Sequence, residues 1–274
     1  MPLGLALCLA ACRSAASIEE RAAPAAGKPV PAPSVPDPSP PVLPQAGEET
    51  PMKGGELVYV TGVRAPAAIL SGETLVATVQ GNLPTPAWKL TDVEVAVVAA
   101  PRPARIQLTP RAQPPEPGVI SVQMLQPFER KAEVKDLAEG SYLIVARGRD
   151  QGSRGNQRVE VLPLNTVVFL HTQGGIAGIE RSIRVTADKR ARLESSRQTE
   201  PRERELDEAA YGAVLDALRA LKSDARSQNS PRGADMIRYD LAWVVDHKLL
   251  LSNLDDGTLG DAERAVAARL DELF

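Results

Sequence analysis

The residue types that most often carry catalysis are sparse in this sequence. It has two histidines, His171 and His247, and neither has a partner at the helical spacing of a zinc motif. No serine lies in a GxSxG elbow, and Ser252 near Asp255 does not make a triad by proximity in sequence. We therefore expect solvated histidines, His171 at a strand end and His247 in a turn, with no catalytic residue and no metal ligand.

Two short segments resemble ligand sites only in part. The Gly-Gly-Ile-Ala-Gly run at 174–178 lacks GxGxxG spacing, and no Walker lysine follows it. Asp255-Asp256-Gly257 lacks the later ligands of a calcium loop, so we expect a plain turn there. These patterns predict no cofactor, no small-molecule substrate and no enzymatic activity.

Both cysteines, Cys8 and Cys12, lie near the start of the sequence, so no disulfide framework or thiolate site is expected after them. The run Leu9-Ala10-Ala11-Cys12 resembles the lipobox of bacterial lipoproteins. The resemblance implies a signal segment over 1–12, a lipid on Cys12 and a place in the cell envelope. Arg13 in place of an aspartate implies the outer membrane. An ordinary cleaved signal is the alternative, because no Lys or Arg precedes the short apolar run.

Residues 13–55 have the composition of a tether. Nine prolines recur there: Pro24, Pro29, Pro31, Pro33, Pro36, Pro38, Pro40, Pro41 and Pro44. Proline disfavours both helix and sheet, so a disordered, extended segment is expected. At about 3.1 Å per residue it spans on the order of 100 Å. No other stretch approaches the roughly 20 apolar residues of a membrane span, so we expect the lipid to be the only membrane contact.

The overall composition bounds what the folded part can be. The chain has 274 residues, 43% of them hydrophobic, which suffices for one large or two small domains. Its net charge is −3 and aromatic residues make up 3%, which argues against a nucleic-acid partner. The cores must be built from Ala, Val, Leu and Ile.

Residues 56–162 alternate in the manner of short strands separated by Pro and Gly turns. Leu75, Ala77 and Val79 share one face, and Val93, Val95 and Val97 repeat the period. The run 137–148 predicts a tight turn into a strand, and Trp88 is expected in the core. About seven such segments over roughly 100 residues predict an immunoglobulin-like β-sandwich with no visible chemistry.

Residues 165–274 predict a small α+β domain of order ββαββα, so the whole chain is expected to be mainly β plus α+β. Val167–Leu170 and the strand from Ile179 flank the glycine-rich run, which indicates a hairpin. The charged stretch 187–205 indicates a solvated loop, with Pro201 at the first position of a helix. A second hairpin and a last helix follow, the latter with a Thr258–Asp261 capping box. Apolar faces are expected from Leu206, Ala210, Ala213, Ala217, Leu218 and Leu221, from Ile237, Tyr239, Leu241, Trp243 and Val245, and from Val266, Leu270 and Leu273.

Two motifs in this region resemble emfourin, the family of protein inhibitors of protealysin-type M4 metalloproteases. They are Gly174-Gly175-Ile176-Ala177-Gly178-Ile179 followed by Arg181, and Gly233-Ala234-Asp235 leading to Tyr239. The resemblance implies an inhibitory loop that enters the substrate cleft of a thermolysin-like protease. Two features depart from the family: an aromatic residue is usual at the position of Ile176, and most members are small free proteins.

Two functional hypotheses follow for the whole chain. One is a lipid-anchored inhibitor of an M4-type metalloprotease, with Ile176 offered to a subsite that prefers bulky aliphatic side chains. The other is a structural or adhesive envelope lipoprotein with protein- or glycan-binding modules. If the glycines only make a tight turn and Ile176 packs in the core, the loop does not inhibit.

Overall fold

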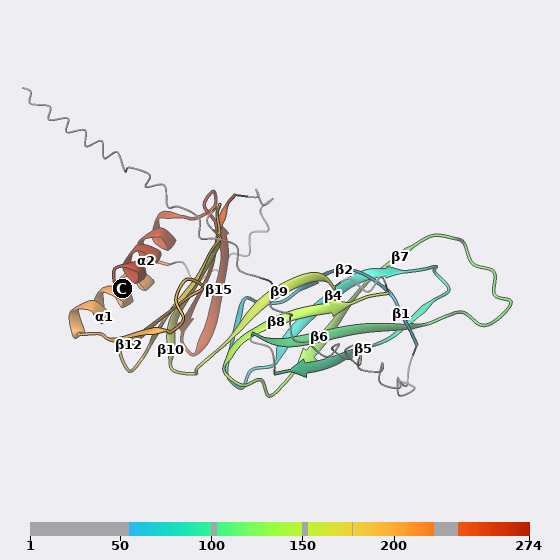
Figure 1. The fold of residues 1–274 in the computed structure, drawn as a ribbon, viewed down its shortest axis with the longest axis horizontal. Coiled ribbons are helices and arrows are strands. Elements are labelled where there is room, and N and C mark those ends of the chain that lie inside the picture. Colours follow the sequence, from blue (N-terminus) through green and yellow to red (C-terminus); the bar gives the residue numbers. More distant parts are fainter. Residues whose placement is uncertain (1–54, 100–102, 150–152, 177, 222–234) are drawn as a thin grey trace, which may run out of the picture. The chain divides into compact units, whose positions relative to one another are not determined.

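Most of the regular structure of the protein is β-strand, as predicted (Figure 1). The structure is a computed structural model, and it describes residues 55–99, 103–149, 153–176, 178–221 and 235–274. The expected signal segment, Cys12 and almost all of the expected tether lie outside these residues. Within the described residues, neither helix is long and apolar enough to cross a membrane.

The strands from the first part of the chain form two sheets. They are β1 (Glu56–Leu57), β2 (Tyr59–Arg64), β3 (Ala68–Leu70), β4 (Leu75–Leu83), β5 (Lys89–Val98), β6 (Ala104–Gln113), β7 (Gln126–Val134), β8 (Gly140–Arg147) and β9 (Ser153–Leu162). One sheet has the order β1-β6-β8-β9-β3, with β5 paired to β6, and the other has the order β2-β4-β7. The pairs β3–β9 and β6–β8 are parallel, and the others are antiparallel.

Both sheets contribute to one apolar core. The predicted alternation of Leu75, Ala77 and Val79 is confirmed, since all three side chains are fully buried in that core. The same prediction for β5 is wrong beyond Val93, because Val95 and Val97 are 38% and 50% exposed. Within the described residues β5 pairs with β6 alone, and a strand at the edge of a sheet is covered less completely. The expected core position of Trp88 is met in part: it is half-buried and packs against Val58, Leu83 and Ala112.

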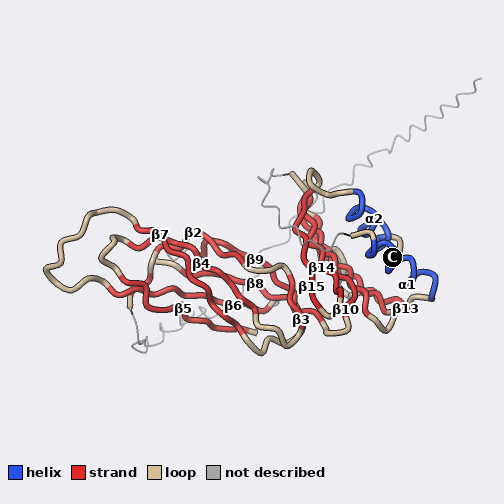
Figure 2. The backbone as a smooth tube through the Cα atoms, turned by 180° about the vertical axis from the view of Figure 1, so that it is seen from behind, coloured by secondary structure: helices blue, strands red, loops and turns tan. Residues whose placement is uncertain are grey.

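The third sheet comes entirely from the last part of the chain. Its strands are β10 (Thr166–Gly174), β11 (Ile179–Thr186), β12 (Arg190–Ser195), β13 (Arg202–Glu205), β14 (Ile237–Val245) and β15 (Lys248–Asp255). They pair antiparallel in the order β13-β12-β11-β10-β14-β15. The helices α1 (Glu208–Arg219) and α2 (Asp261–Asp271) cover one face of this sheet (Figure 2).

The core between this sheet and the helices contains most of the predicted apolar faces. Val168, Leu170, Ile183 and Val185 from the sheet pack in one cluster with Leu206. Val266, Leu270 and Leu273 are buried in the same cluster, as expected. The period-2 pattern of β14 is confirmed for Leu241 and Trp243, which lie in this core, but not for Val245 at the end of the strand, which is 42% exposed.

Three local predictions in this region are wrong. The charged stretch 187–205 is not a loop but contains β12 and β13, so the order is ββββαββα. Pro201 precedes β13, and α1 begins only at Glu208, capped by the side chain of Asp207, which accepts a hydrogen bond from Ala210 N. Helix α2 has Gly260 at its N-cap with no side-chain bond, while Thr258 bonds to Asp255 instead.

The second face of the third sheet carries an apolar cluster shared with the first part of the chain. Phe169 and Ala242 pack there with Ala68, Leu70 and Leu162. Residues 51–274 accordingly form one compact unit. The helix-free face of the sheet is therefore partly covered, which sets the surroundings of the charged side chains described below.

Candidate functional site

The glycine-rich motif forms the turn that joins β10 to β11. Gly174, Gly175 and Gly178 have φ values of 115°, 70° and 58°, all in the region that favours glycine. Gly178 N donates a hydrogen bond of 3.0 Å to Gly175 O and closes the turn. Ala177 lies outside the described residues. The predicted hairpin is confirmed, and its turn depends on the three glycines.

Strand β14 supports this turn from one side. Gly174 pairs with Ile179 on β11 and with Ile237 on β14, so three strand ends meet there. A Cβ atom on Gly174 would lie 2.5 Å from Met236 O, which leaves no room for a side chain. Gly175 N also donates to Met236 O, at 3.4 Å. The backbone of the turn is thus held against the start of β14.

Ile176 lies at the end of this turn with its side chain in solvent. It is 92% exposed. The alternative in which Ile176 packs in the core is therefore excluded. The turn thus exposes the large aliphatic side chain of Ile176 on a backbone that is held against Met236.

Of the second predicted motif, Tyr239 has a supporting role. Its hydroxyl donates a hydrogen bond of 3.0 Å to Asp256 Oδ1, and Asp256 Oδ2 accepts one from Ile237 N, also at 3.0 Å. Burial, followed by the hydrogen bond and charge of Asp256, raises the pKa of Tyr239. Tyr239 therefore stays a neutral donor that fixes the start of β14, with its ring against the helix-side core.

The rest of that motif is less informative. Asp235 is exposed in a turn that leads into β14. Gly233 and Ala234 lie outside the described residues. Sequence reasoning treated Asp256 only as part of a turn and missed its bonds to Tyr239 and Ile237. The turn itself is confirmed: Asp255 Oδ1 accepts from Gly257 N at 3.1 Å and from Thr258 N at 3.0 Å.

The prediction of a solvated His171 is wrong. It lies within β10 and is 3% exposed, while Asp240 on the neighbouring β14 is 6% exposed. His171 Nδ1 is 3.5 Å from Asp240 Oδ2, and Arg238 Nε donates to Asp240 Oδ1 at 2.9 Å. The second ring nitrogen, Nε2, is buried without a hydrogen bond and lies 4.0 Å from Glu180 Oε1. His247, by contrast, is exposed in a turn as predicted.

Ser182 pairs with His171 across the same face of the sheet, so serine, histidine and aspartate lie on three adjacent strands. Ser182 is 9% exposed, and the histidine nitrogen that would accept its proton makes no hydrogen bond. Activation of a serine requires that bond and access for a substrate. The geometry described here lacks that hydrogen bond.

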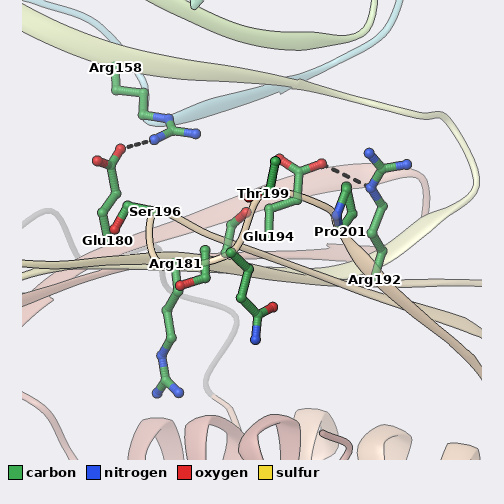
Figure 3. Close-up of a pocket in the computed structure, with 11 residues that line it drawn as sticks. Arg158, Glu180, Arg181, Arg192, Glu194, Ser196, Thr199 and Pro201 are labelled. Atoms are coloured by element: carbon green, nitrogen blue, oxygen red, sulfur yellow. Dashed lines mark hydrogen bonds and ion pairs between the residues drawn. The ribbon is translucent and has the colours of Figure 1, made fainter.

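A polar pocket of about 400 Å³ adjoins this group (Figure 3). Glu180 pairs with Arg158 from β9, and Arg192 Nε donates to Glu194 at 2.9 Å. Arg181 points instead toward the helices, where it bonds Asp271 at 2.8 Å (Figure 3). The charged side chains that line the pocket are thus all ion-paired. The pocket therefore presents mainly hydroxyl and amide groups: Ser182, Ser195, Ser196, Gln198 and Thr199.

One carboxyl group near this pocket is buried. Glu160 is 8% exposed and accepts a hydrogen bond of 2.5 Å from Ser141 Oγ. Desolvation raises the pKa of Glu160, although Ser141 and the Arg158 guanidinium oppose the shift. No sequence motif indicates this residue, because its burial depends on strands far apart in the sequence.

Comparison with protein families, with curated proteins and with solved structures finds no match for this chain.

Proposed function

We propose that the protein is a membrane-anchored inhibitor of a thermolysin-like M4 metalloprotease, and that the turn carrying Ile176 enters the active-site cleft. The observation that carries the proposal is the 92% exposure of Ile176 on a turn of three glycines with positive φ. An exposed aliphatic side chain at the end of a hairpin matches a cleft that binds bulky aliphatic residues.

The support around the turn also favours inhibition. Met236 O accepts a hydrogen bond from Gly175 N, and the carboxylate of Asp256 accepts hydrogen bonds from Ile237 N and from the Tyr239 hydroxyl. A loop already held in one conformation loses little entropy when it binds, which strengthens binding at a given contact area. The inhibitor resemblance of the two glycine motifs points to the same loop.

The finer fold assignments belong to this proposal. We infer that the first two sheets form an immunoglobulin-like sandwich, supported by their common core and by Tyr142, whose hydroxyl donates to Ala138 O at 2.9 Å. A tyrosine that bonds the backbone a few residues upstream is typical of such sandwiches. The third sheet with its two helices corresponds to the emfourin-like domain. A lipid on Cys12, in the outer membrane, would keep the inhibitor at the cell surface.

The test measures proteolysis by a panel of thermolysin-type enzymes in the presence of the full chain carrying Cys12→Ser, which removes the lipid site. We expect stoichiometric inhibition of at least one enzyme. Ile176→Asp should weaken it by about 30-fold or more, because a charge would enter an apolar subsite without a partner.

Ile120→Asp is the matched control, since Ile120 is 98% exposed in a different loop. It should leave inhibition unchanged. Undiminished proteolysis across the panel, or equal inhibition by the Ile176→Asp and unsubstituted chains, would contradict the proposal. A chain that recovers only scaffold proteins from an envelope extract would favour the structural alternative.

A further inference from the structure

The segment between β6 and β7 exposes an unusual amount of apolar side chain. Five aliphatic residues in 119–125 are more than half exposed: Val119 53%, Ile120 98%, Val122 71%, Met124 60% and Leu125 55%. Figure 1 shows this segment, in light green, extending beyond the ends of both strands. We call residues 119–125 the apolar loop.

The apolar loop is uncharged, and its exposed side chains include pairs that are adjacent in sequence. Neighbours in sequence, Val119 with Ile120 and Met124 with Leu125, are exposed alike, so no single face is presented. No charged residue occurs between Glu116 and Glu129. A protein groove covers one face of a segment, whereas an apolar liquid surrounds it on all sides. Exposure on more than one face therefore favours a lipid surface over a protein groove.

The start of the described chain lies at the base of this loop. Gly55 lines a small pocket together with Gln113 and Pro114–Pro117. The backbone of Glu56 pairs with Ala112, and Arg111 Nη1 donates to Gly55 O at 3.3 Å. The chain before Gly55 therefore joins the folded part at the end that carries the apolar loop. If Cys12 carries the lipid proposed above, the tether attaches to the folded part at the end that carries the apolar loop.

From these three observations we propose that the apolar loop inserts into the surface of a phospholipid bilayer. Insertion is shallow, at the level of the headgroups and the first acyl carbons, because the loop backbone needs water or headgroups as hydrogen-bond partners. Attachment depends on burial of aliphatic side chains and not on basic residues, so it should be insensitive to salt. The membrane contact goes beyond the lipid on Cys12, and it does not depend on protease inhibition.

The first experiment is flotation of the full Cys12→Ser chain with vesicles of phosphatidylethanolamine and phosphatidylglycerol, at low and high salt. We expect binding at both salt concentrations. Ile120→Asp should lower the partition coefficient by about tenfold or more, because the aspartate would have to leave water. Ile176→Asp is the control: the same substitution at a residue 92% exposed should leave binding unchanged.

The second experiment places a polarity-sensitive fluorophore on the loop, because the apolar leader at 2–11 can itself bind vesicles. Cys8→Ser and Cys12→Ser are combined with Val122→Cys, or with Leu164→Cys as control. Both labelled positions are 71% exposed. We expect vesicles to shift the emission of the label at position 122 to shorter wavelength and to leave that at position 164 unchanged.

Several results would overturn the proposal. One is flotation without any spectral shift at position 122, which would assign binding to the leader. Another is equal flotation of the Ile120→Asp and Ile176→Asp chains. A third is a soluble dimer, seen by sedimentation, that Ile120→Asp dissociates while no chain binds vesicles. That outcome would assign the loop to a second copy of the chain. The effect of Ile176→Asp on inhibition has no bearing on vesicle binding. The inhibitor proposal and the membrane proposal can therefore be refuted independently.

Discussion

Gly174 and Met236 approach each other so closely that a single added carbon would collide with backbone. A Cβ on Gly174 would lie 2.5 Å from Met236 O, and its φ of 115° lies outside the conformations that other residues adopt readily. We predict that Gly174→Ala lowers the free energy of unfolding by about 3 kcal/mol, through steric overlap and backbone strain together. Chemical denaturation of both chains measures it.

Gly178→Ala provides the comparison for this prediction. Gly178 has a φ of 58°, and a Cβ there would meet nothing within 4 Å. Only the left-handed conformation is penalised, at about 1 kcal/mol. If the two substitutions destabilise equally, the contact with Met236 does not restrict the turn.

The hydrogen bond from Tyr239 to Asp256 should matter to both stability and inhibition. Tyr239→Phe removes a bond of 3.0 Å and should lower the free energy of unfolding by about 1 kcal/mol. Because Asp256 also holds Ile237 N, the substitution should loosen the β10–β11 turn and weaken inhibition. Tyr142→Phe removes a bond of 2.9 Å to Ala138 O elsewhere in the chain and should leave inhibition intact. Titration of a thermolysin-type enzyme with each variant measures the inhibition that Tyr239→Phe and Tyr142→Phe retain.

Asp240 is a buried carboxylate between Arg238 and His171 on the helix-free face of the third sheet. Asp240→Ala leaves Arg238 without its 2.9 Å bond and His171 without a carboxylate neighbour, so we predict a loss of about 3 kcal/mol. Asp216→Ala breaks a pair with Arg219 that is 71% and 74% exposed, and it should change stability by less than about 0.5 kcal/mol. Denaturant unfolding of both variants measures the two losses of stability. Equal stability of the Asp240→Ala and Asp216→Ala chains would contradict the prediction.

Glu160 predicts a pH dependence of stability. Burial raises its pKa above the ordinary value of 4.5. Below that value the carboxyl is protonated in both folded and unfolded chains and contributes no difference. As pH rises, the unfolded chain releases the proton first, so the folded state loses stability until the pH exceeds the raised pKa.

Glu160→Gln removes this titration and keeps an acceptor for Ser141 Oγ. We expect its melting temperature to exceed that of the unsubstituted chain at pH 7 and the two to converge near pH 4. Thermal scans across this interval give the comparison. A difference that is independent of pH would mean that Glu160 is not the titrating group.

The strand patterns of the sequence predicted much of the local structure. Alternation at Leu75–Val79, and at Leu241 and Trp243 in β14, placed the same side chains inward as the fold does. Period-2 and helical spacing are local properties, so they are visible without tertiary contacts. The charges of the stretch 187–205 indicate a solvated loop, whereas β12 buries Ala191 and Leu193 in the core and pairs with the exposed β13. On this ladder Arg192 bonds Glu194 and Glu203.

In the candidate site, too, local features were predictable from the sequence and tertiary contacts were not. Glycines at 174, 175 and 178 indicated a turn from sequence alone, because few other residues adopt their backbone conformation. The support from Met236 and Asp256 was not predictable, since these residues are separated from the turn by more than 50 positions.

The sequence by itself thus determined a mainly β fold and a glycine turn carrying Ile176. Tertiary structure alone decided which of these side chains reach solvent. It left Ile176 and Ile120 almost fully exposed and buried His171 and Glu160 between strands. The physical reason is that burial is set by the neighbours that distant strands bring to a residue, whereas turn and strand preferences are set by the residue and its neighbours in sequence.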